Sequence, residues 1–572
     1  GTQRVSSGGA AVGGNVAGTQ AVMTGGTASA MNIYGRQNVT GRAYDTVIRK
    51  GGTQTIYAGG YAQSTVVSSG GRVSVNGSGK TYKVTVLGGG TQHLSAGAFA
   101  NATTVSSGGG LIVSSGGSTE NVTIKVGGSQ ILSGGSAVST TVGIGGALLV
   151  SRGGVSMDGQ INNTGAQFVY SGGAAQGMTV TSGGSQFVLA GGRATSSIVK
   201  AGGTQRVSSG GAAVGGNVAG TQAVVTGGTA SAMNMYGRQN VTGRVYDTVI
   251  RKGGTQTIYA GGYAQSMVVS SGGRVSVNGS GKTYKVTVLG GGTQHLSAGA
   301  FANATTVSSG GVMSLGSGAS ATSLKILEGG SASVEGGVSL SGTTTVSGGL
   351  RVSGTGNTVS DMKTSLSTSI SYDVTSVNVA DTMYMLSSSM ERTFSGRDFS
   401  ISVSAEQQAG VYELSSGFIM TSGTEFSIIL DGRSVGEAVL NGGAFHYGGR
   451  SYAVTSDNED RVQLTVSEST SRMATFTRTD EVNVASYASA TQERTNTASA
   501  DGMPPLFDTG EAGTAFAAGT DCTVKELSGQ NILFTDTSTI RAVFGCADTL
   551  MPTENAAGLG DTRSRTGVLA SV

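Results

Sequence analysis

The stretch GGTQTIYAGGYAQSTVVSSGG, Gly51–Gly71, contains the pattern that decides the fold. Glycine pairs divide it into two short segments. In the first segment Gln54 and Ile56 lie two residues apart, so on a strand they share one face while Thr53 and Thr55 share the other. Glycine adopts positive φ at tight corners without a Cβ clash. The stretch therefore predicts two short β-strands joined by glycine corners.

The same two-segment unit recurs along most of the chain. The first segment usually reads Thr/Ser-Gln-x-aliphatic, as at Gln3 and Val5, Gln92 and Leu94, Gln130 and Leu132, Gln167 and Val169, and Gln186 and Val188. The second begins with Ala and reaches Val five residues on, as at Ala62 and Val67, Ala100 and Val105, Ala137 and Val142, Ala175 and Val180, and Ala194 and Val199. Most glycine pairs return after roughly 18 to 19 residues, with one longer step of about 27, which indicates a repeat architecture.

These units predict an all-β fold, an elongated parallel β-helix (solenoid) of Gly-rich coils of about 19 residues, over residues 1–358. Stacked coils lie roughly 4.8 Å apart, so about 18 of them form a rod on the order of 90 Å long. Stacking places like residues above one another. We therefore expect ladders of Val, Ile and Leu inside the rod, together with ladders of Gln amides.

A larger repeat supports the stacking model. Residues 1–109 recur at 203–311, differing only where Met23, Ile33, Ala43 and Thr65 become Val225, Met235, Val245 and Met267. Only an architecture that grows by adding like units accepts a block of this size without rebuilding its core.

Composition excludes several other classes of protein. Glycine contributes 100 of 572 residues but proline only 3, so the chain is not collagen. Hydrophobic residues, at 37%, recur in register with the glycines, which argues against a disordered Gly/Ser-rich chain. The net charge of +3 is spread along the chain without a basic stripe, so no nucleic-acid partner is expected.

After the solenoid we expect two further regions. Residues 359–467 contain short alternating runs such as Phe399–Val403 and Glu425–Leu430, separated by turns such as Asp431-Gly432, which predict a small antiparallel β-sandwich or β-roll domain. Residues 468–572 form a weakly structured, poorly ordered C-terminal segment. This segment holds the two cysteines, Cys522 and Cys546, and the sequence does not decide whether they are bonded.

The repeated motifs Gly52-Thr53-Gln54, Val66–Gly71 and Thr104–Gly108 resemble the strand-loop-strand repeat of AIDA-type self-associating autotransporter adhesin passengers, over roughly residues 1–354. The resemblance implies a right-handed β-helix exported to the bacterial outer surface, with roles in adherence, autoaggregation and biofilm formation. It also implies a glycosyltransferase that modifies passenger Ser and Thr in some members.

The ends of the chain lead us to expect a fragment. Gly1 falls within a repeat, and the sequence shows neither a signal peptide nor a run of 18 apolar residues. The last residues lack the terminal aromatic of a membrane barrel, so we expect no such barrel here. The secretion route is left open.

Residues with catalytic or metal-binding chemistry are sparse. The acids Asp45, Glu120, Asp158 and Glu328 are isolated, whereas general acid–base catalysis needs two positioned groups. The histidines His93, His295 and His446 lack neighbouring ligands. The acidic turns at Asp431-Gly432, Asp457–Asp460 and Asp501-Gly502 are weak candidates for calcium sites, but solvated turns are the favoured interpretation. We therefore predict no enzyme, no cofactor, and no catalytic, cofactor-binding or metal site.

The outward rows of Ser and Thr are the most informative functional feature, because stacked coils present them as long faces of low charge. We expect a surface adhesin fragment whose solenoid mediates self-association, biofilm formation or attachment. Its partners are then other copies of the chain, host-surface or matrix glycans or proteins, and a Ser/Thr glycosyltransferase. Two alternatives remain: a passive extracellular stalk that displays residues 359–467 as a binding domain, and, more remotely, a glycan-cleaving β-helix enzyme.

Overall fold

The computed structural model describes residues 1–393, 398–457, 460–469, 472–477, 495–500, 532–536 and 565–569. These described residues contain strands and turns and no helix, so the all-β prediction is confirmed. They belong to two compact units, Gly1–Ala332 (unit 1) and Ser333–Val572 (unit 2).

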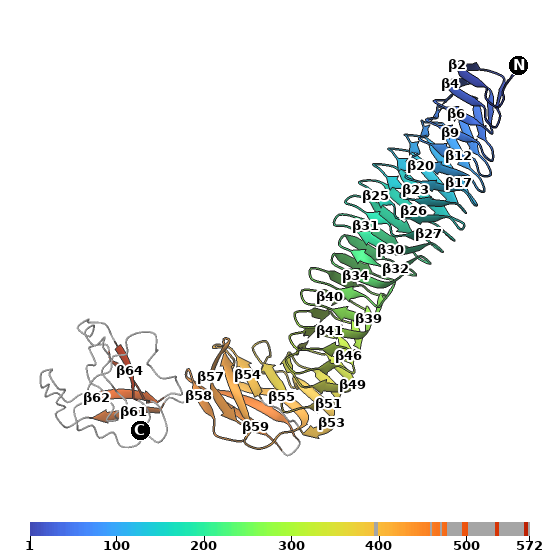
Figure 1. The fold of residues 1–572 in the computed structure, drawn as a ribbon. Coiled ribbons are helices and arrows are strands. Elements are labelled where there is room, and N and C mark those ends of the chain that lie inside the picture. Colours follow the sequence, from blue (N-terminus) through green and yellow to red (C-terminus); the bar gives the residue numbers. More distant parts are fainter. Residues whose placement is uncertain are drawn as a thin grey trace. The chain divides into compact units, whose positions relative to one another are not determined.

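Unit 1 is a parallel β-solenoid in which each coil contributes to two sheets, sheet A and sheet B (Figure 1). Sheet A takes one strand from each of eighteen coils: β1 (Thr2–Val5), β3 (Thr19–Val22), β5 (Arg36–Val39), β8 (Thr53–Ile56), β11 (Arg72–Val75), β14 (Thr91–Leu94), β17 (Gly110–Ser114), β20 (Ser129–Ser133), β23 (Ala147–Ser151), β26 (Ala166–Val169), β29 (Ser185–Val188), β31 (Thr204–Val207), β33 (Thr221–Val224), β35 (Arg238–Val241), β38 (Thr255–Ile258), β40 (Arg274–Val277), β42 (Thr293–Leu296) and β45 (Val312–Leu315). Each pairs in parallel with the next coil, so the predicted solenoid is confirmed.

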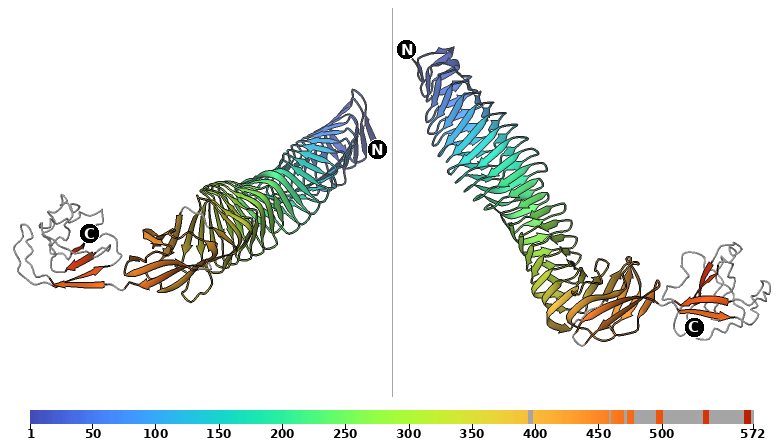
Figure 2. Two further views of the ribbon diagram at one scale, coloured as in Figure 1. Left: turned by 90° about the horizontal axis from the view of Figure 1, so that it is seen from below. Right: turned by 180° about the vertical axis from the view of Figure 1, so that it is seen from behind.

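Sheet B takes one or two strands from each coil, and Figure 2 shows both sheets running along the unit. Its strands are β2 (Ala10–Val16), β4 (Thr27–Ile33), β6 (Arg42–Tyr44), β7 (Val47–Ile48), β9 (Tyr61–Gln63), β10 (Val66–Val67), β12 (Lys80–Tyr82), β13 (Thr85–Val86), β15 (Phe99–Asn101), β16 (Thr104–Val105), β18 (Ser118–Glu120), β19 (Thr123–Ile124), β21 (Ser136–Val138), β22 (Thr141–Val142), β24 (Val155–Met157), β25 (Gln160–Ile161), β27 (Ala174–Gln176), β28 (Thr179–Val180), β30 (Arg193–Val199), β32 (Ala212–Val218), β34 (Thr229–Met235), β36 (Arg244–Tyr246), β37 (Val249–Ile250), β39 (Tyr263–Val269), β41 (Lys282–Val288), β43 (Phe301–Asn303), β44 (Thr306–Val307), β46 (Ser320–Thr322) and β47 (Lys325–Ile326).

The two glycines of a corner pair serve different purposes. Gly89 adopts φ +73°, a left-handed conformation that most residues disfavour. A Cβ on Gly90 would lie 2.6 Å from the carbonyl oxygen of Val67 in the preceding coil, too close for any side chain. One glycine thus turns the chain, and the other allows the coils to stack closely.

The core lies between the two sheets. In the coil that starts at Thr53, the side chains of Ile56, Ala62, Thr65 and Val67 are fully buried, and equivalent residues repeat from coil to coil. Burial of an aliphatic side chain of this size contributes about 1.5–3 kcal/mol. The predicted aliphatic ladders are confirmed.

A buried ladder of glutamine amides runs alongside the aliphatic residues of sheet A. In the first run Gln20 Nε2 donates to Gln3 Oε1 at 2.6 Å, Gln37 to Gln20 at 2.6 Å, and Gln54 to Gln37 at 2.7 Å. The second run continues in the same direction through Gln167, Gln186, Gln205, Gln222, Gln239 and Gln256. Because every amide donates toward the N-terminus, the run ends with Gln167 Nε2 and Gln256 Oε1 unpartnered among the described residues.

The two copies of the 109-residue block differ mainly inside the core. Met235, Val245 and Met267 of the second copy are buried, as are Ile33, Ala43 and Thr65 in the first. Thr65 Oγ1 donates to Gln54 Oε1 at 3.4 Å, a contact that Met267 cannot make to the equivalent Gln256.

Unit 2 begins within β48 (Ser331–Glu335) and continues with strands of both orientations. These are β49 (Ser339–Val346), β50 (Gly349–Ser353), β51 (Asn357–Thr364), β52 (Ser369–Asp373), β53 (Leu386–Thr393), β54 (Asp398–Val403), β55 (Gly410–Ile419), β56 (Glu425–Leu430), β57 (Arg433–Val439), β58 (Phe445–Tyr447), β59 (Arg450–Ser456) and β60 (Val462–Glu468). Antiparallel pairs join β56 to β57, β55 to β60, and β58 and β60 to β59.

Parallel pairing in unit 2 extends past residue 359, where an antiparallel domain was expected to begin. Strands β50, β52, β54 and β56 pair in parallel, and only the strands after β56 reverse direction. The partners in β52 and β54 are 29 residues apart, as in Ser369 and Asp398, because longer connections separate them. The longer connections interrupt the regular spacing of the glycine pairs, but the strands still pair in parallel. The domain boundaries at residues 359 and 468 stay a prediction.

The C-terminal prediction falls mostly outside the described residues, as do Cys522 and Cys546. Its described parts are β61 (Arg472–Thr477), β62 (Thr495–Ala500), β63 (Ile532–Asp536) and β64 (Arg565–Leu569), which pair consecutively as antiparallel strands.

Candidate functional surfaces

An uncharged face covers five neighbouring coils of sheet A. We define it as the outward residues of β17, β20, β23, β26 and β29, each of them half-buried. Its centre is an apolar row in which consecutive residues are direct parallel partners: Ile112, Ile131, Leu149, Phe168 and Phe187. The rings of Phe168 and Phe187 stack with 5.0 Å between centroids and 9° between planes.

Small and hydroxyl side chains flank this apolar row. The other outward residues of the face are Gly110, Ser114, Ser129, Ser133, Ala147, Ser151, Ala166 and Ser185. The apolar row ends at a polar residue on each side. His93 is the parallel partner of Ile112 at one end, and Arg206 is the partner of Phe187 at the other. The face is therefore confined to the segment between the two duplicated blocks.

Sheet B carries a row of outward hydroxyls. Thr85, Thr104, Thr123 and Thr141 are consecutive parallel partners, and Gln160 and Thr179 continue the row. The threonines of this row are half-buried on the outer surface, and Gln160 is exposed. The structure thus brings together the Ser and Thr rows that the sequence predicts.

The three histidines lie on different strands of the described structure. His93 Nε2 lies 2.7 Å from Ser114 Oγ, and burial followed by the charge of Arg72 lowers the pKa of this imidazole. His295 contacts Ser314, and His446 lies in β58 of unit 2. Among the described residues no group of three or more His, Cys, Asp or Glu could hold a metal ion.

The acids of the solenoid are also dispersed. Asp45 and Asp158 occupy left-handed corner positions, and Glu120 accepts a hydrogen bond from Asn101 at 3.2 Å. Asp431 forms a hairpin turn with Gly432, and Asp457 Oδ1 accepts from the backbone of Arg461 at 3.1 Å. Asn458, Glu459, Asp501 and Gly502 lie outside the described residues.

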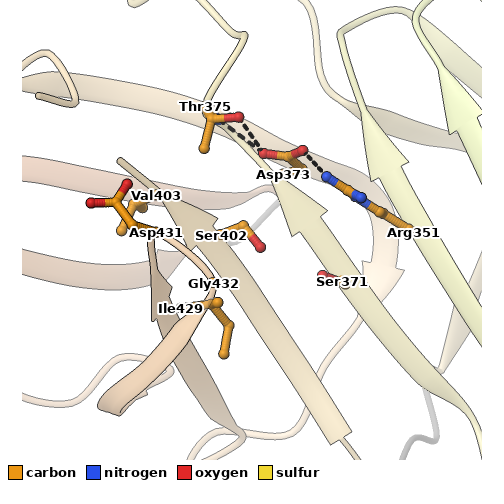
Figure 3. A pocket seen from close by; sticks show the side chains of 9 residues that line it. All are labelled: Arg351, Ser371, Asp373, Thr375, Ser402, Val403, Ile429, Asp431 and Gly432. Atoms are coloured by element: carbon orange, nitrogen blue, oxygen red, sulfur yellow. Dashed lines mark hydrogen bonds and ion pairs between the residues drawn. The ribbon is translucent and has the colours of Figure 1, made fainter. Parts of the chain in front are cut away.

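Unit 2 has an open pocket of about 440 Å³ that contains two carboxylates, Asp373 and Asp431 (Figure 3). Thr375 donates to Asp373 from its backbone at 3.2 Å and from Oγ1 at 2.7 Å, and Arg351 forms an ion pair with the same carboxylate. Burial alone would raise the pKa of Asp373, but the hydrogen bonds from Thr375 and Arg351 outweigh it and lower that pKa.

Asp373 does not suit the role of the general acid in glycan hydrolysis. A glycosidase needs one carboxylic acid whose raised pKa keeps it protonated so that it can donate to the leaving group. The lowered pKa of Asp373 favours the charged form instead. Its bonds to Thr375 and Arg351 give Asp373 a structural role.

No helix in the described part of the chain is long and apolar enough to cross a membrane. Unit 1 is a β-solenoid with long outer faces of low charge.

Part of this solenoid matches a known family model. Residues 158–221 match the family model described as "Adhesin of bacterial autotransporter system, probable stalk". A solved structure of a hyperglycosylated TibA fragment, modified by TibC, is 36% identical, and the match covers 48% of this chain and 96% of that one with a TM-score of 0.41. No curated protein matches the sequence.

Residues 158–221 thus resemble the stalk of AIDA-type autotransporter adhesin passengers. The predicted resemblance is therefore confirmed. The match to this adhesin model supports a non-enzymatic adhesin passenger, and the model implies a cell-surface or extracellular location.

The apolar row was not predicted from the sequence. A signal was present, because Leu111–Val113 and Leu148–Val150 are continuous apolar runs that place apolar residues on both faces of a strand.

Proposed function

We propose that the solenoid mediates self-association between copies of this chain through the uncharged face of sheet A. One observation carries the proposal: an apolar row flanked by hydroxyls continues over five coils without a charged outward residue. Such a face can pair with its own copy because like charges do not oppose each other. Apolar burial and hydroxyl hydrogen bonds then both favour contact.

The size of the face predicts a weak single contact. Five strands spaced about 4.8 Å apart, each four to five residues long, cover roughly 24 Å by 15 Å, or about 350 Å². A stable interface buries about 800 Å² on each partner. We therefore expect weak association of single molecules in solution and strong adhesion between cells that display many copies, because linked contacts raise the effective concentration.

To test this proposal, the full chain is displayed on cells that do not clump by themselves. Ile131→Lys and Phe168→Lys should each reduce sedimentation by clumping several-fold, because a charge at the centre of the contact must lose water. Thr55→Lys and Thr257→Lys are matched controls, since both residues face outward from the same sheet within the duplicated blocks. They should clump like the parent.

A mixing experiment tests whether residue 168 lies at the contact between two copies. Cells that display Phe168→Lys and cells that display Phe168→Glu should each disperse alone and clump when mixed, because the introduced charges attract across the contact. Undiminished clumping by the lysine variants would reject the face. A parent chain that leaves cells dispersed would favour the passive stalk.

We also propose that the threonine row of sheet B accepts O-linked sugar from a glycosyltransferase. The half-buried, outward hydroxyls of Thr85, Thr104, Thr123 and Thr141 support this, as does the identity to a TibA fragment that TibC glycosylates. Coexpression with TibC followed by peptide mass spectrometry should find hexose- or heptose-sized additions on these strands. Unmodified threonine-row peptides would contradict the proposal.

A further inference from the structure

Sheet B carries a cluster of tyrosines and basic residues that appears once in each duplicated block. We define the tyrosine–basic patch as six outward residues of three consecutive coils: Arg42, Tyr44, Tyr61, Lys80, Tyr82 and Lys83. Its second copy consists of Arg244, Tyr246, Tyr263, Lys282, Tyr284 and Lys285.

Stacking alternates cations and aromatic rings within the patch. Tyr61 is the parallel partner of Arg42 on one side and of Lys80 on the other. The rings of Tyr44 and Tyr61 lie 6.2 Å apart between centroids, and Lys83 Nζ lies 5.4 Å from the centroid of Tyr82. Patch residues of one coil lie at most three positions apart, whereas their parallel partners in the next coil lie 19 positions away, so the sequence alone shows no basic stripe.

The second copy reproduces this arrangement. Its ring centroids are 5.9 Å apart for Tyr246 and Tyr263, and 5.0 Å apart for Tyr263 and Tyr284. Tyr61 and Tyr263 each donate to a glutamine two residues on, Gln63 at 2.9 Å and Gln265 at 2.6 Å. The two patches therefore form equivalent surfaces.

The positive charge of each patch is available to a ligand. Arg42, Lys80 and Lys83 are exposed, and Asp45 is the acid beside them, which leaves an excess of two positive charges. None of these three cations forms an ion pair within the described part of the chain. An exposed ammonium or guanidinium group binds carboxylate or sulfate, and guanidinium can do so with two parallel hydrogen bonds.

We propose that each tyrosine–basic patch binds an acidic oligosaccharide, a short sugar chain that bears carboxylate or sulfate groups. Tyrosine offers an apolar ring for the C–H face of a sugar and a hydroxyl for hydrogen bonding, while the neighbouring cations hold the acid groups. The patch spans three coils, about 10 Å along the solenoid, which fits a few sugar units. Nucleic acid suits it less, because single strands follow a continuous positive groove.

The duplication makes the surface bivalent. Eleven parallel steps separate β9 from β39, so the two patches lie about 53 Å apart on one sheet. A polysaccharide long enough to reach both patches gains from the higher effective concentration at the second one. This inference is independent of the self-association proposal, since it uses the other sheet and other residues.

Calorimetric titration of the full chain tests the proposal with defined probes. A galacturonic acid tetrasaccharide and a chondroitin sulfate tetrasaccharide distinguish carboxylate from sulfate, and maltotetraose is the neutral comparison. We expect two equivalent sites for at least one acidic probe. Replacing Arg42, Lys80 and Lys83 by Gln should leave one site, and the same changes at Arg244, Lys282 and Lys285 should remove the second.

Two further variants keep the proposal falsifiable. Tyr61→Ser with Tyr263→Ser preserves every charge and should still weaken tetrasaccharide binding at least tenfold. Replacing Lys125, Lys200 and Lys325 by Gln lowers the net charge equally outside the patches and should change nothing. Polygalacturonate should bind the one-patch variant at least tenfold more weakly than the parent.

Several outcomes would overturn the inference. They are a site number unaffected by the patch variants, equal binding of maltotetraose, full binding by the tyrosine double variant, or tighter binding of oligo(dT) than of either acidic tetrasaccharide. Circular dichroism of each variant checks that the solenoid is intact.

Discussion

At the scale of single residues, the glutamine ladder shows how a polar side chain can be stabilised inside the solenoid. Each amide in the middle of a run satisfies its donor with the coil before it and its acceptor with the coil after it. A residue in the middle of a run therefore leaves two partners unsatisfied when it is removed. A residue at the end leaves only one.

Replacing Gln222 by Leu should destabilise the second run strongly. The change leaves Gln205 Oε1 and Gln239 Nε2 without their partners, and each buried unsatisfied group costs about 1–3 kcal/mol. We expect a total cost of about 2–6 kcal/mol, measured as lost hydrogen-exchange protection in β31, β33 and β35.

Gln256→Leu is the matched control at the end of the same run. It orphans only Gln239 Oε1 and removes an oxygen that is itself unpartnered in the described structure. Its cost should be at most half that of Gln222→Leu. Equal or larger destabilisation by the end variant would show that the ladder is not the source of the stability.

At the scale of strands and corners, the sequence predicts those features that recur at the same place in each coil. Gln54 and Ile56 reveal their common face through a spacing of two, and the glycine pairs mark two corners of each coil. The third corner was not predictable, because residues as different as Ser64, Lys83, Ala102 and Asn121 adopt φ between 53° and 56° there. The backbone N–H group of each donates to a carbonyl oxygen of the following coil, as Ser64 does to Tyr82. The contact with the neighbouring coil therefore stabilises the left-handed conformation.

The candidate surfaces were only partly predictable for the same reason. The threonine row follows from the repeat, whereas the tyrosine–basic patch joins residues that the sequence separates. In unit 2 the parallel pairing of β52 and β54 was hidden, because their long connection erases the glycine period on which the prediction depends.

Asp373 at the end of β52 should make unit 2 sensitive to acid. Its pKa is lowered from 3.8 in the folded chain, so the stability it contributes is fully present above that ordinary value and disappears as the pH falls through the folded pKa. Thermal melting of the parent should therefore show a lower midpoint at pH 3 than at pH 5.

Asp373→Asn removes the titrating group of this interaction. The variant should melt below the parent at pH 7 and lose less stability between pH 5 and pH 3, because an amide cannot form the ion pair with Arg351. Glu437→Gln, which removes an exposed acid of β57, is the control and should titrate like the parent. An unchanged pH dependence in Asp373→Asn would contradict the assigned role.

At the scale of the whole molecule, the duplicated blocks permit deletions that preserve every local sequence. Removing residues 110–311 joins Gly109 to Val312, and Gly311, the equivalent of Gly109, precedes Val312 in the parent. Eleven coils are lost, which shortens unit 1 by about 53 Å. Because each coil contacts mainly its neighbours, the remaining coils should stack and melt cooperatively.

Removing residues 1–202 instead gives a nearly identical protein. The two deletion variants have the same length and differ only where Met23, Ile33, Ala43 and Thr65 are exchanged for Val225, Met235, Val245 and Met267. Each variant lacks the uncharged face and retains one tyrosine–basic patch. Both should keep a β-rich circular dichroism spectrum, leave displaying cells dispersed and bind one acidic tetrasaccharide. If both variants still clump, the self-associating surface lies outside residues 110–202. If both lose β structure, the coils depend on distant neighbours.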